Sequence, residues 1–569
     1  MKKIKINVNG EEVVAFEGER LIDALSRLGI KVPTLCSHKH LSPSGSCRLC
    51  VVEIEKAPRL MASCTTPVYK GMVVRTHSSR VIKSRRVNIE LLLANHNKDC
   101  TSCAQNLNCR LQKYSEELMI DEVRFDGEKR KSQPDNSSIS IKRDNSKCIL
   151  CSKCFRVCND IQSVYAINQL NRGFYSKVAP PFNLNMKDSN CVNCGQCVIA
   201  CPTGALSEQN NVRKVADALS SGKYLIAQTA PSIRATLGEL FNIQPGTPVT
   251  GKMVSALREL GFKKVFDTDF AADITIVEEA TEFIKRFKNK KDLPMITTCC
   301  PAWIKFAEQY FFEQLNHMSS CRSPQAMMAS LIKTYFAKKN NLKAEDIILV
   351  DIMPCTAKKY EINRPEFSGE ADFVLTTVEL SKLIKQHNIN FAKLNDSDFD
   401  NPFGESSGAG AIFGRSGGVM EAALRSAADI ISGEDLKDFN YKKVRGLSTV
   451  KEAEINIAGQ EIKVCVVHTL GEARKIMDQI REGSSPYDFI EIMACYGGCI
   501  GGGGQPRYED DSLLISRAKA IACEDDSKNI KKSHLNPSVI KLYKEYLGDF
   551  GGKKAHKLLH TVYDEKEAI

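Results

Sequence analysis

The sequence contains no apolar run long enough to cross a membrane. None of its uninterrupted apolar stretches approaches the ~20 residues that a membrane helix needs. An export signal is also missing, because the first residues, MKKIKINVNG, alternate polar and apolar side chains instead of placing a continuous apolar stretch after the charges. These absences predict a cytoplasmic protein that does not enter a membrane.

Tryptophan is nearly absent as well, with a single residue among 569. The net charge of +11 would suit a nucleic-acid binder. However, the basic residues are dispersed along the chain and form no patch interleaved with aromatic side chains. We therefore expect no nucleic-acid partner.

Cysteine, in contrast, is abundant, with 23 residues. The number is odd, many of the thiols stand in C-x2-C spacing, and no export signal precedes them. Stable disulfides belong mainly to oxidising compartments. In a reducing compartment, the same pattern indicates metal binding.

The first group of cysteines has the spacing C-x10-C-x2-C-x13-C and comprises Cys36, Cys47, Cys50 and Cys64. It follows an expected β-hairpin, in which IKINVN and VVAF flank the turn pair Asn9-Gly10, and an expected short helix in LIDALSRLG. The spacing differs from that of plant ferredoxins but keeps the central C-x2-C, which favours a 2Fe-2S cluster. A zinc site is the alternative.

The second group has the spacing H-x3-C-x2-C-x5-C and comprises His96, Cys100, Cys103 and Cys109. Three thiolates and one imidazole can hold a 4Fe-4S cluster, although zinc fits the spacing equally well. The alternative for His96 is a surface histidine after a helix.

A third group repeats the run C-x2-C-x2-C-x3-C, which is typical of bacterial ferredoxins with two 4Fe-4S clusters. In such proteins the fourth cysteine of each run serves the other cluster. One cluster is therefore assigned to Cys148, Cys151, Cys154 and Cys201. The other is assigned to Cys191, Cys194, Cys197 and Cys158.

Three motifs lie in the second half of the chain, namely TTCCPAW (297–303), MPCTAKKYE (353–361) and ACYGGCIGGGGQP (494–506). Together they resemble the three signature motifs of the FeFe hydrogenases, and the accessory groups match the large clostridial-type members in the same order. By this resemblance Cys300, Cys355, Cys495 and Cys499 hold a 4Fe-4S cubane, and Cys499 bridges to a di-iron subsite with carbonyl, cyanide and dithiolate ligands. The two parts form the H-cluster. The glycines beside Cys495 and Cys499 allow the backbone to approach a bulky cofactor.

The resemblance also implies a proton relay. Cys299 is left over from the cubane, and a thiol with a tunable pKa can pass protons to the cofactor. The further members implied are Glu279, Ser319 and Glu282, with Arg286 near the surface. Glu279 and Glu282 stand at i and i+3 and so share one face of a helix, for which a solvated carboxylate face is the alternative.

Residues lining the cofactor follow by position in the family. Lys358 would donate to an anionic cyanide, and two methionines and a phenylalanine would form an apolar lining. Ordinary core packing is the alternative for each. The implied set is Ala230, Pro231, Ser232, Gln325, Met353, Lys358, Phe413 and Met493.

Two positions depart from these motifs, namely Thr298 and Tyr496, which stands at a variable position between Cys495 and Gly497, and three further cysteines lie outside the motifs. Thr298 stands where relatives usually have serine, which preserves a hydroxyl that can tune the cluster environment. Cys321, Cys465 and Cys523 fit no motif, and we expect them to be buried structural thiols.

The expected fold class is multidomain, combining α+β and α/β. We expect a β-grasp, plant-ferredoxin-like 2Fe-2S domain at 1–80, a His-ligated 4Fe-4S domain at 81–125 and a two-cluster 4Fe-4S ferredoxin domain at 126–209. GEKRKSQPDNSS, inside the third, is expected to be a loop. A catalytic α/β domain is expected at 210–569, where YLIAQTA, DIILVDIMP and IKVCVVHTL predict strands and GKMVSALRELG and GGVMEAALRSAADII predict helices.

The resemblance implies reversible reduction of protons to hydrogen, with electrons from ferredoxin or flavodoxin and separate maturation proteins for the di-iron site. One alternative is the catalytic subunit of an NAD-linked multi-subunit hydrogenase, because residues 1–210 also resemble a subunit of NADH dehydrogenase complexes. NAD chemistry would then need partner subunits, since GAGAIFG is not a G-x-G-x-x-G loop between strand and helix. A hydrogen sensor or an iron–sulfur scaffold protein without turnover is a further alternative, against which Cys299 argues.

Overall fold

The computed structural model describes the chain except residues 1, 436–440, 458 and 569. It divides into two compact units. The first comprises Met1–Ile161, Tyr165–Ser189 and Ala200–Ser207, and the second Gln162–Val164, Asn190–Ile199 and Glu208–Ile569. No helix among the described residues is both long and apolar enough to span a membrane.

The first unit begins with a five-stranded sheet in the order β2-β1-β5-β3-β4. The strands are β1 (Lys3–Val8), β2 (Glu11–Phe16), β3 (Val51–Ile54), β4 (Met61–Ala62) and β5 (Val73–Arg75). The expected hairpin is confirmed, because β1 and β2 pair antiparallel around Asn9 and Gly10, whose φ angles of 56° and 97° suit a tight two-residue turn. Helix α1 (Leu21–Arg27) packs Leu21 and Leu25 into the core of this sheet, as the β-grasp expectation requires.

The rest of the first unit consists of short elements. They are α2 (Ser79–Ala94), α3 (Arg110–Glu117), β6 (Ile141–Arg143), α4 (Lys153–Arg156), β7 (Asn168–Leu170), β8 (Lys177–Ala179) and most of β9 (Leu206–Glu208). The segment GEKRKSQPDNSS contains no helix and only an isolated bridge at Asp135, which confirms the expected loop.

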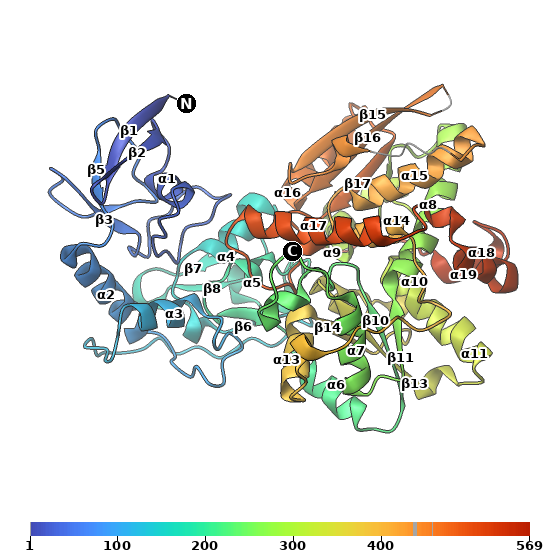
Figure 1. Ribbon diagram of the computed structural model, residues 1–569, viewed down its shortest axis with the longest axis horizontal. Helices are drawn as coiled ribbons and strands as arrows, with labels where there is room; N and C mark the ends of the chain where they lie inside the picture. Colours follow the sequence, from blue (N-terminus) through green and yellow to red (C-terminus); the bar gives the residue numbers. More distant parts are fainter. Residues whose placement is uncertain (1, 436–440, 458, 569) are drawn as a thin grey trace. The chain divides into compact units, whose positions relative to one another are not determined.

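The second unit contains two four-stranded sheets (Figure 1). One is wholly parallel, with the order β11 (Lys264–Asp267), β10 (Tyr224–Thr229), β13 (Ile347–Met353) and β14 (Phe373–Thr376). The other has the order β12 (Met295–Ile296), β17 (Phe489–Met493), β16 (Gln460–His468) and β15 (Val450–Ile457), with only β15 antiparallel. The three predicted strands and the α/β class are confirmed.

The helices of the second unit connect these strands and cover them. They are α6 (Val212–Leu219), α7 (Thr250–Leu260), α8 (Thr268–Asn289), α9 (Pro301–Tyr310), α10 (Pro324–Leu331), α11 (Ala337–Lys339), α12 (Ala357–Glu361), α13 (Thr377–Gln386), α14 (Gly408–Ala411), α15 (Gly418–Ser432), α16 (Leu470–Arg481), α17 (Asp511–Ser527), α18 (Pro537–Leu542) and α19 (Lys553–Leu559), and α5 (Gln196–Ala200) begins in this unit.

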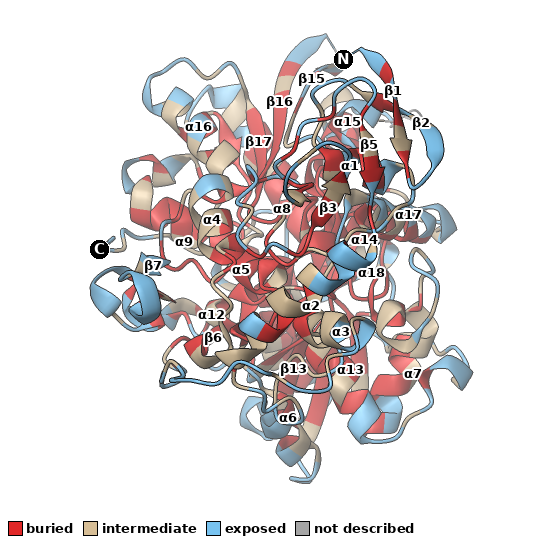
Figure 2. Ribbon diagram, turned by 90° about the vertical axis from the view of Figure 1, so that its left-hand side faces the viewer, coloured by how far each residue is buried: buried red, intermediate tan, exposed pale blue. Residues whose placement is uncertain are grey.

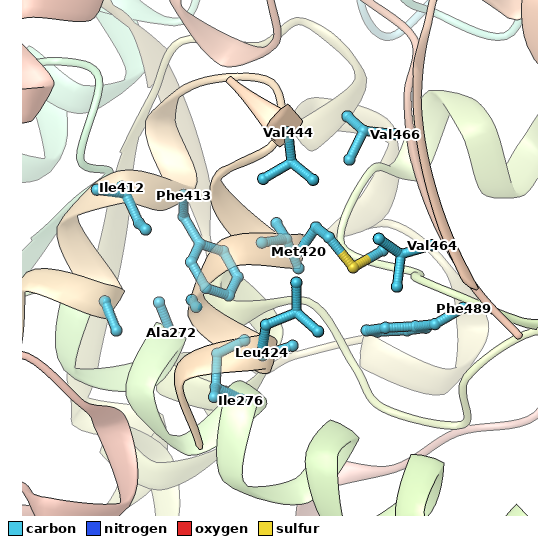
Figure 3. Close-up of a cluster of buried hydrophobic side chains, with 14 of the residues drawn as sticks. Ala272, Ile276, Ile412, Phe413, Met420, Leu424, Val444, Val464, Val466 and Phe489 are labelled. Atoms are coloured by element: carbon cyan, nitrogen blue, oxygen red, sulfur yellow. The ribbon is translucent and has the colours of Figure 1, made fainter. Parts of the chain in front are cut away.

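Helix α8 is buried on both sides. On one side Ile276 and Phe283 belong to a hydrophobic core that also contains residues of α15, β16 and β17 (Figure 3). Figure 2 colours most of β16 and β17 as buried. On the other side Phe270 and Ile274 pack with residues of β10, β11 and β13. The helix therefore lies between the two sheets, which explains why Asp273, Glu278 and Glu279 are sheltered from solvent.

Replacing Phe283 by alanine is expected to lower the free energy of unfolding by about 3–5 kcal/mol. The ring is 2% exposed and stacks on Phe489 with centroids 4.9 Å apart, so its loss leaves a cavity between α8 and β17. Fluorescence of Trp303, which is buried in the same unit, reports the denaturant midpoint. The matched change at Phe312, which is 47% exposed, should shift the free energy by less than about 0.5 kcal/mol, and equal effects would contradict the packing argument.

Candidate functional site

The four cysteines of the first group are buried and lie together in the first unit. The thiols of Cys36 and Cys47 are hydrogen-bonded to each other, and so are those of Cys50 and Cys64. Cys50 precedes β3 and Cys64 follows β4, and the antiparallel pairing of these strands brings them close. Four convergent thiols match the donor set that a 2Fe-2S cluster requires.

His96, in the second group, is buried directly after α2, so the alternative of a surface histidine is wrong. Its Nδ1 has no hydrogen-bond partner among the described residues. Burial lowers the pKa of the imidazole to about 4, which leaves it neutral at pH 7 with a lone pair available. A buried, neutral imidazole nitrogen without a hydrogen-bond partner, such as Nδ1 of His96, is suited to bind a metal. Cys100 and Cys103 share a turn, and Cys109 caps α3.

In the third group, Cys148, Cys151, Cys154 and Cys201 line one cavity of the first unit. Cys201 is the last cysteine of the second run, but the fold places it beside three cysteines of the first run, as the ferredoxin pattern predicts. Cys158 lies in the first unit, whereas Cys191, Cys194 and Cys197 lie in the second. The assignment of these four to one cluster stays a prediction.

The cysteines of the second-half motifs follow the carboxyl ends of strands from both sheets. Cys300 lies shortly after β12, Cys355 after β13 and Cys495 after β17, and the three thiols lie near one another and near Cys499. Ligands of α/β folds characteristically bind beyond the carboxyl ends of strands. Burial, and then the neighbouring Cys300, raise the pKa of Cys355 to about 12, a penalty that the positive charge of a bound iron cluster would offset.

Close backbone packing holds the glycine-rich loop in this position. Gly498 has a φ of 85°, and a Cβ at this residue would lie 2.4 Å from the backbone nitrogen of Ser416. A Cβ at Gly502 would lie 2.3 Å from the carbonyl oxygen of Pro354, the residue before Cys355. Gly502 therefore lets the segments that carry Cys355 and Cys499 approach each other, and Gly498 lets the loop approach Ser416.

The segment of Cys191–Cys197 packs against this loop within the second unit. A Cβ at Gly503 would lie 2.5 Å from the carbonyl oxygen of Cys194. Lys305, in α9, donates to the carbonyl oxygen of Cys191 at 2.8 Å, and Gln196 donates to that of Gly501 at 2.9 Å. The thiols assigned to an accessory cluster are thereby placed beside the proposed cubane ligands.

Lys358 and Gln325 are buried polar residues beside the same site. The ammonium of Lys358 donates to Glu361 at 2.7 Å and to Ser323 at 2.8 Å. Burial opposes its charge, but Glu361 outweighs this effect and raises the pKa of Lys358. The side-chain oxygen and nitrogen of Gln325 are buried without a hydrogen-bond partner among the described residues, which fits a group that contacts a bound cofactor.

The other residues expected to line the cofactor are buried at the ends of core elements. Ala230, Pro231 and Ser232 follow β10, and Met353 and Met493 end β13 and β17. Phe413 lies in the core cluster of Figure 3 together with Met493. Their contact with a cofactor stays a prediction.

Sequence reasoning missed Gln505, although it belongs to the third motif. Its amide nitrogen lies 3.3 Å from Ser232 Oγ and 3.2 Å from the carbonyl oxygen of Cys499, while its oxygen accepts from Thr236 and Thr377 at 2.7 Å. Gln505 therefore joins the Cys499 loop to the segments after β10 and β14. A glutamine within a glycine-rich motif was the available signal.

The expected proton relay lies on and beside α8. Arg286 donates to Glu282 at 2.6 Å, and Ser319 donates to the other oxygen of that carboxylate at 3.3 Å. Neither carboxylate oxygen of Glu279 has a hydrogen-bond partner among the described residues, although Ser319 is near. Burial, and then the repulsion of Glu282, raise the pKa of Glu279 to about 8, whereas Ser319 opposes the shift.

Burial raises the pKa of Cys299 well above its ordinary value, and the nearby Glu279 and Cys300 raise it further. Cys299 is thus a neutral thiol between the carboxyl group of Glu279 and the proposed cubane ligands. The fold brings all five expected relay residues together. Glu279 is buried on a helix enclosed by two sheets, so the alternative of a solvated carboxylate face is wrong for Glu279, whereas Glu282 is partly exposed.

The structure also gives positions for Thr298 and for the three cysteines that lie outside the motifs, and one of these cysteines differs from expectation. The hydroxyl of Thr298 donates to the carbonyl oxygen of Cys321 at 2.7 Å. Cys321 and Cys465 are buried. Cys523 is exposed, so the expectation that it is a buried structural thiol was wrong. It lies on a side of α17 that is open to solvent.

Comparison with known proteins agrees with this geometry. Residues 223–503 match the model of the iron-only hydrogenase large subunit, C-terminal domain. The chain is 45% identical, over its full length and that of the relative, to the NADP-reducing hydrogenase subunit HndD of Solidesulfovibrio fructosivorans. It is 39% identical to iron hydrogenase 1 of Clostridium pasteurianum, with 98% of this chain and 99% of the relative covered.

The chain belongs to the iron-only, or FeFe, hydrogenases. A solved structure of a variant of the FeFe hydrogenase HydA1 from Chlamydomonas reinhardtii superposes with a TM-score of 0.56 at 36% identity, covering 63% of this chain and all of the other. Further matches are a 2Fe-2S binding domain at 1–79, an NADH-ubiquinone oxidoreductase-G iron-sulfur region at 85–124 and a 4Fe-4S dicluster domain at 122–205. This FeFe hydrogenase therefore carries iron-sulfur cofactors.

The C-terminal residues 511–566 match a separate family model, the iron hydrogenase small subunit. They form α17, α18 and α19, with a break at Gly548 before α19. These residues fall inside the single catalytic domain expected at 210–569, and no motif predicted them as a separate region. The four domain boundaries given above stay predictions.

Proposed function

We propose that this protein interconverts protons and electrons with molecular hydrogen. The observation that carries the proposal is the convergence of four cysteines, three of which follow strand ends. They lie beside the buried thiol of Cys299 and the carboxyl group of Glu279, and the relay continues from these to Arg286. The proposed cofactors are one 2Fe-2S cluster, three accessory 4Fe-4S clusters and an H-cluster held by Cys300, Cys355, Cys495 and Cys499. When bound, the H-cluster supplies the redox chemistry of the reaction.

The chain's own residues move and hold protons. Arg286, partly exposed, fixes the carboxylate of Glu282, which can take up a proton from the surface side. Ser319 lies between Glu282 and Glu279, and Glu279 is near the Cys299 thiol. Protons therefore pass inward through Glu282, Ser319, Glu279 and Cys299. Lys358 and Gln325 would orient the cofactor through charge-assisted and amide hydrogen bonds.

Hydrogen evolution from the cofactor-matured protein, driven by a reduced low-potential dye, tests this proposal. We expect rapid evolution from protein whose infrared spectrum contains the carbonyl and cyanide bands of the di-iron subsite. Protein with those bands but without turnover would contradict the enzyme and favour a hydrogen sensor.

The electron donor is proposed to be ferredoxin or flavodoxin, with maturation proteins required to install the di-iron subsite. The second candidate function is the catalytic subunit of an NADP-linked, multi-subunit hydrogenase, which the full-length similarity to HndD favours. The two differ in a simple assay of the isolated chain. Evolution with reduced ferredoxin supports the first, whereas a response to NADPH only after partner subunits are added supports the second.

A further inference from the structure

Three metal-binding side chains meet beside the proposed proton relay. Ligand atoms of Glu282, Cys321 and His560 all lie within 4.8 Å of one another. Glu282 is on α8, while Cys321 and His560 face each other in an isolated backbone bridge. Cys321 and His560 are buried and Glu282 is partly exposed, so the group has one side open toward the surface.

The imidazole of His560 is oriented as in metal sites. Its Nε2 lies 2.9 Å from Oε2 of Glu278, whose other oxygen, Oε1, accepts from the hydroxyl of Tyr543. Its Nδ1 lies 2.8 Å from Ser320 Oγ, which in turn lies 3.0 Å from Glu282 Oε2. Metal-bound histidines usually have their second nitrogen held by a carboxylate in this way. Nδ1 therefore lies on the side of Ser320 and Glu282, and it is the ring nitrogen available to a metal once Ser320 Oγ moves or joins the site.

We propose that Glu282, Cys321 and His560 form a binding site for a zinc-like divalent cation. A thiolate, an imidazole and a carboxylate are the donors that Zn²⁺ prefers, and Ser320 Oγ or a water is placed to complete a tetrahedron. Binding requires Cys321 to release its thiol proton to solvent, so the cation replaces that proton. Arg286 holds Oε1 of Glu282 and leaves Oε2 facing the site.

The nearby charges favour a cation. Glu278, Glu279 and Glu282 all lie close enough to Cys321 to influence its thiol. Arg286 is the cation that contacts this carboxylate group, and it binds on the far side of Glu282. A divalent ion would therefore lie beside the carboxyl groups of Glu278 and Glu282, whereas Glu279 is mostly protonated at pH 7.

Occupancy would act on turnover, a consequence that rests on the proposed function. A cation bound to Glu282 Oε2 removes the oxygen to which Ser319 donates. The step between Glu282 and Ser319 is then blocked, so Zn²⁺ should inhibit hydrogen evolution reversibly, and a chelator should restore it.

The direct test is zinc titration of the matured holoenzyme with ZnCl₂, followed by X-ray absorption at the zinc edge. We expect one zinc per chain, with one sulfur at about 2.3 Å and nitrogen or oxygen ligands at about 2.0–2.1 Å. Cys321→Ser and His560→Gln should each weaken the affinity for zinc by at least about 10-fold. Glu278→Gln should weaken it by about 10–100-fold, because Glu278 orients the imidazole of His560. Iron content must stay constant, so that zinc in cluster sites is not counted.

Cys465→Ser, at a buried thiol, and Cys523→Ser, at an exposed thiol, are the matched controls and should leave the affinity unchanged. Zinc bound without sulfur, or an affinity that responds to Cys465 or Cys523 but not to Cys321, would overturn the site. The spectrum of the wild-type protein decides the matter even if a variant fails to fold. Zinc bound as expected but without inhibition would instead contradict the relay role of Glu282.

Discussion

Replacement of Cys299 by alanine is expected to lower the rate of hydrogen evolution by about 10²–10⁴-fold, the range over which a positioned acid or base contributes. The thiol lies between the carboxyl group of Glu279 and the proposed cubane ligand Cys300, so its loss interrupts the last proton step. Methyl groups neither donate nor accept protons. Dye-driven hydrogen evolution by the matured variant measures the effect.

Three comparisons separate a relay defect from a damaged site. The infrared carbonyl and cyanide bands of the variant should persist, because Cys299 is not among the proposed cluster ligands. Cys299→Ser replaces the thiol with a hydroxyl of similar size that hardly ionises, so the rate of hydrogen evolution by this variant should also be low. Cys465→Ala removes a buried thiol from β16 and should leave turnover unchanged. Normal turnover in Cys299→Ala would remove this thiol from the mechanism.

The accessory part of this protein could be predicted from sequence because its ligands are close together along the chain. Cys148, Cys151 and Cys154 stand within one turn-rich segment, and only Cys201 comes from a distance. The hairpin at Asn9 and Gly10 is likewise a local property, set by two residues with positive φ.

The catalytic part depends on contacts that no local pattern encodes. Cys300, Cys355 and Cys495 meet because three strands of two separate sheets end at one place. The residues themselves indicated only that these cysteines are separated, and family resemblance supplied their common role. The burial of Glu279 follows from the position of α8 between the sheets, which the i, i+3 spacing alone could not distinguish from a solvated face.

Two residues mark the limits of motif reasoning. Cys523 was expected inside the protein because unassigned thiols are often buried, but its position on α17 is open to solvent. His560 was not predicted as a site residue, because it belongs to no motif and lies 278 positions after Glu282 (560 − 282). Only the bridge between Cys321 and His560 brings it to the relay.

Replacement of Glu279 by glutamine is expected to lower hydrogen evolution by about 10²–10⁴-fold and to change its pH dependence. Burial and the nearby Glu282 raise the pKa of Glu279 to about 8, so the carboxyl group is mostly protonated at pH 7 and can pass a proton inward. As the pH rises through about 8, the group becomes a persistent carboxylate and donates no proton. The wild-type rate should therefore fall across this range, in addition to the fall caused by the lower proton concentration.

The glutamine variant cannot ionise, so the ratio of wild-type to variant rate should decline as the pH passes about 8. That ratio removes the dependence on proton concentration that both proteins share. Asp273→Asn makes the same carboxylate-to-amide change at another buried position of α8, where Ser407 and Asn536 hold the side chain, and should keep the wild-type profile. A constant ratio from pH 6 to 10 would show that a different group controls proton delivery. A declining ratio assigns that control to Glu279, whose environment between two sheets gives it a pKa near the working pH.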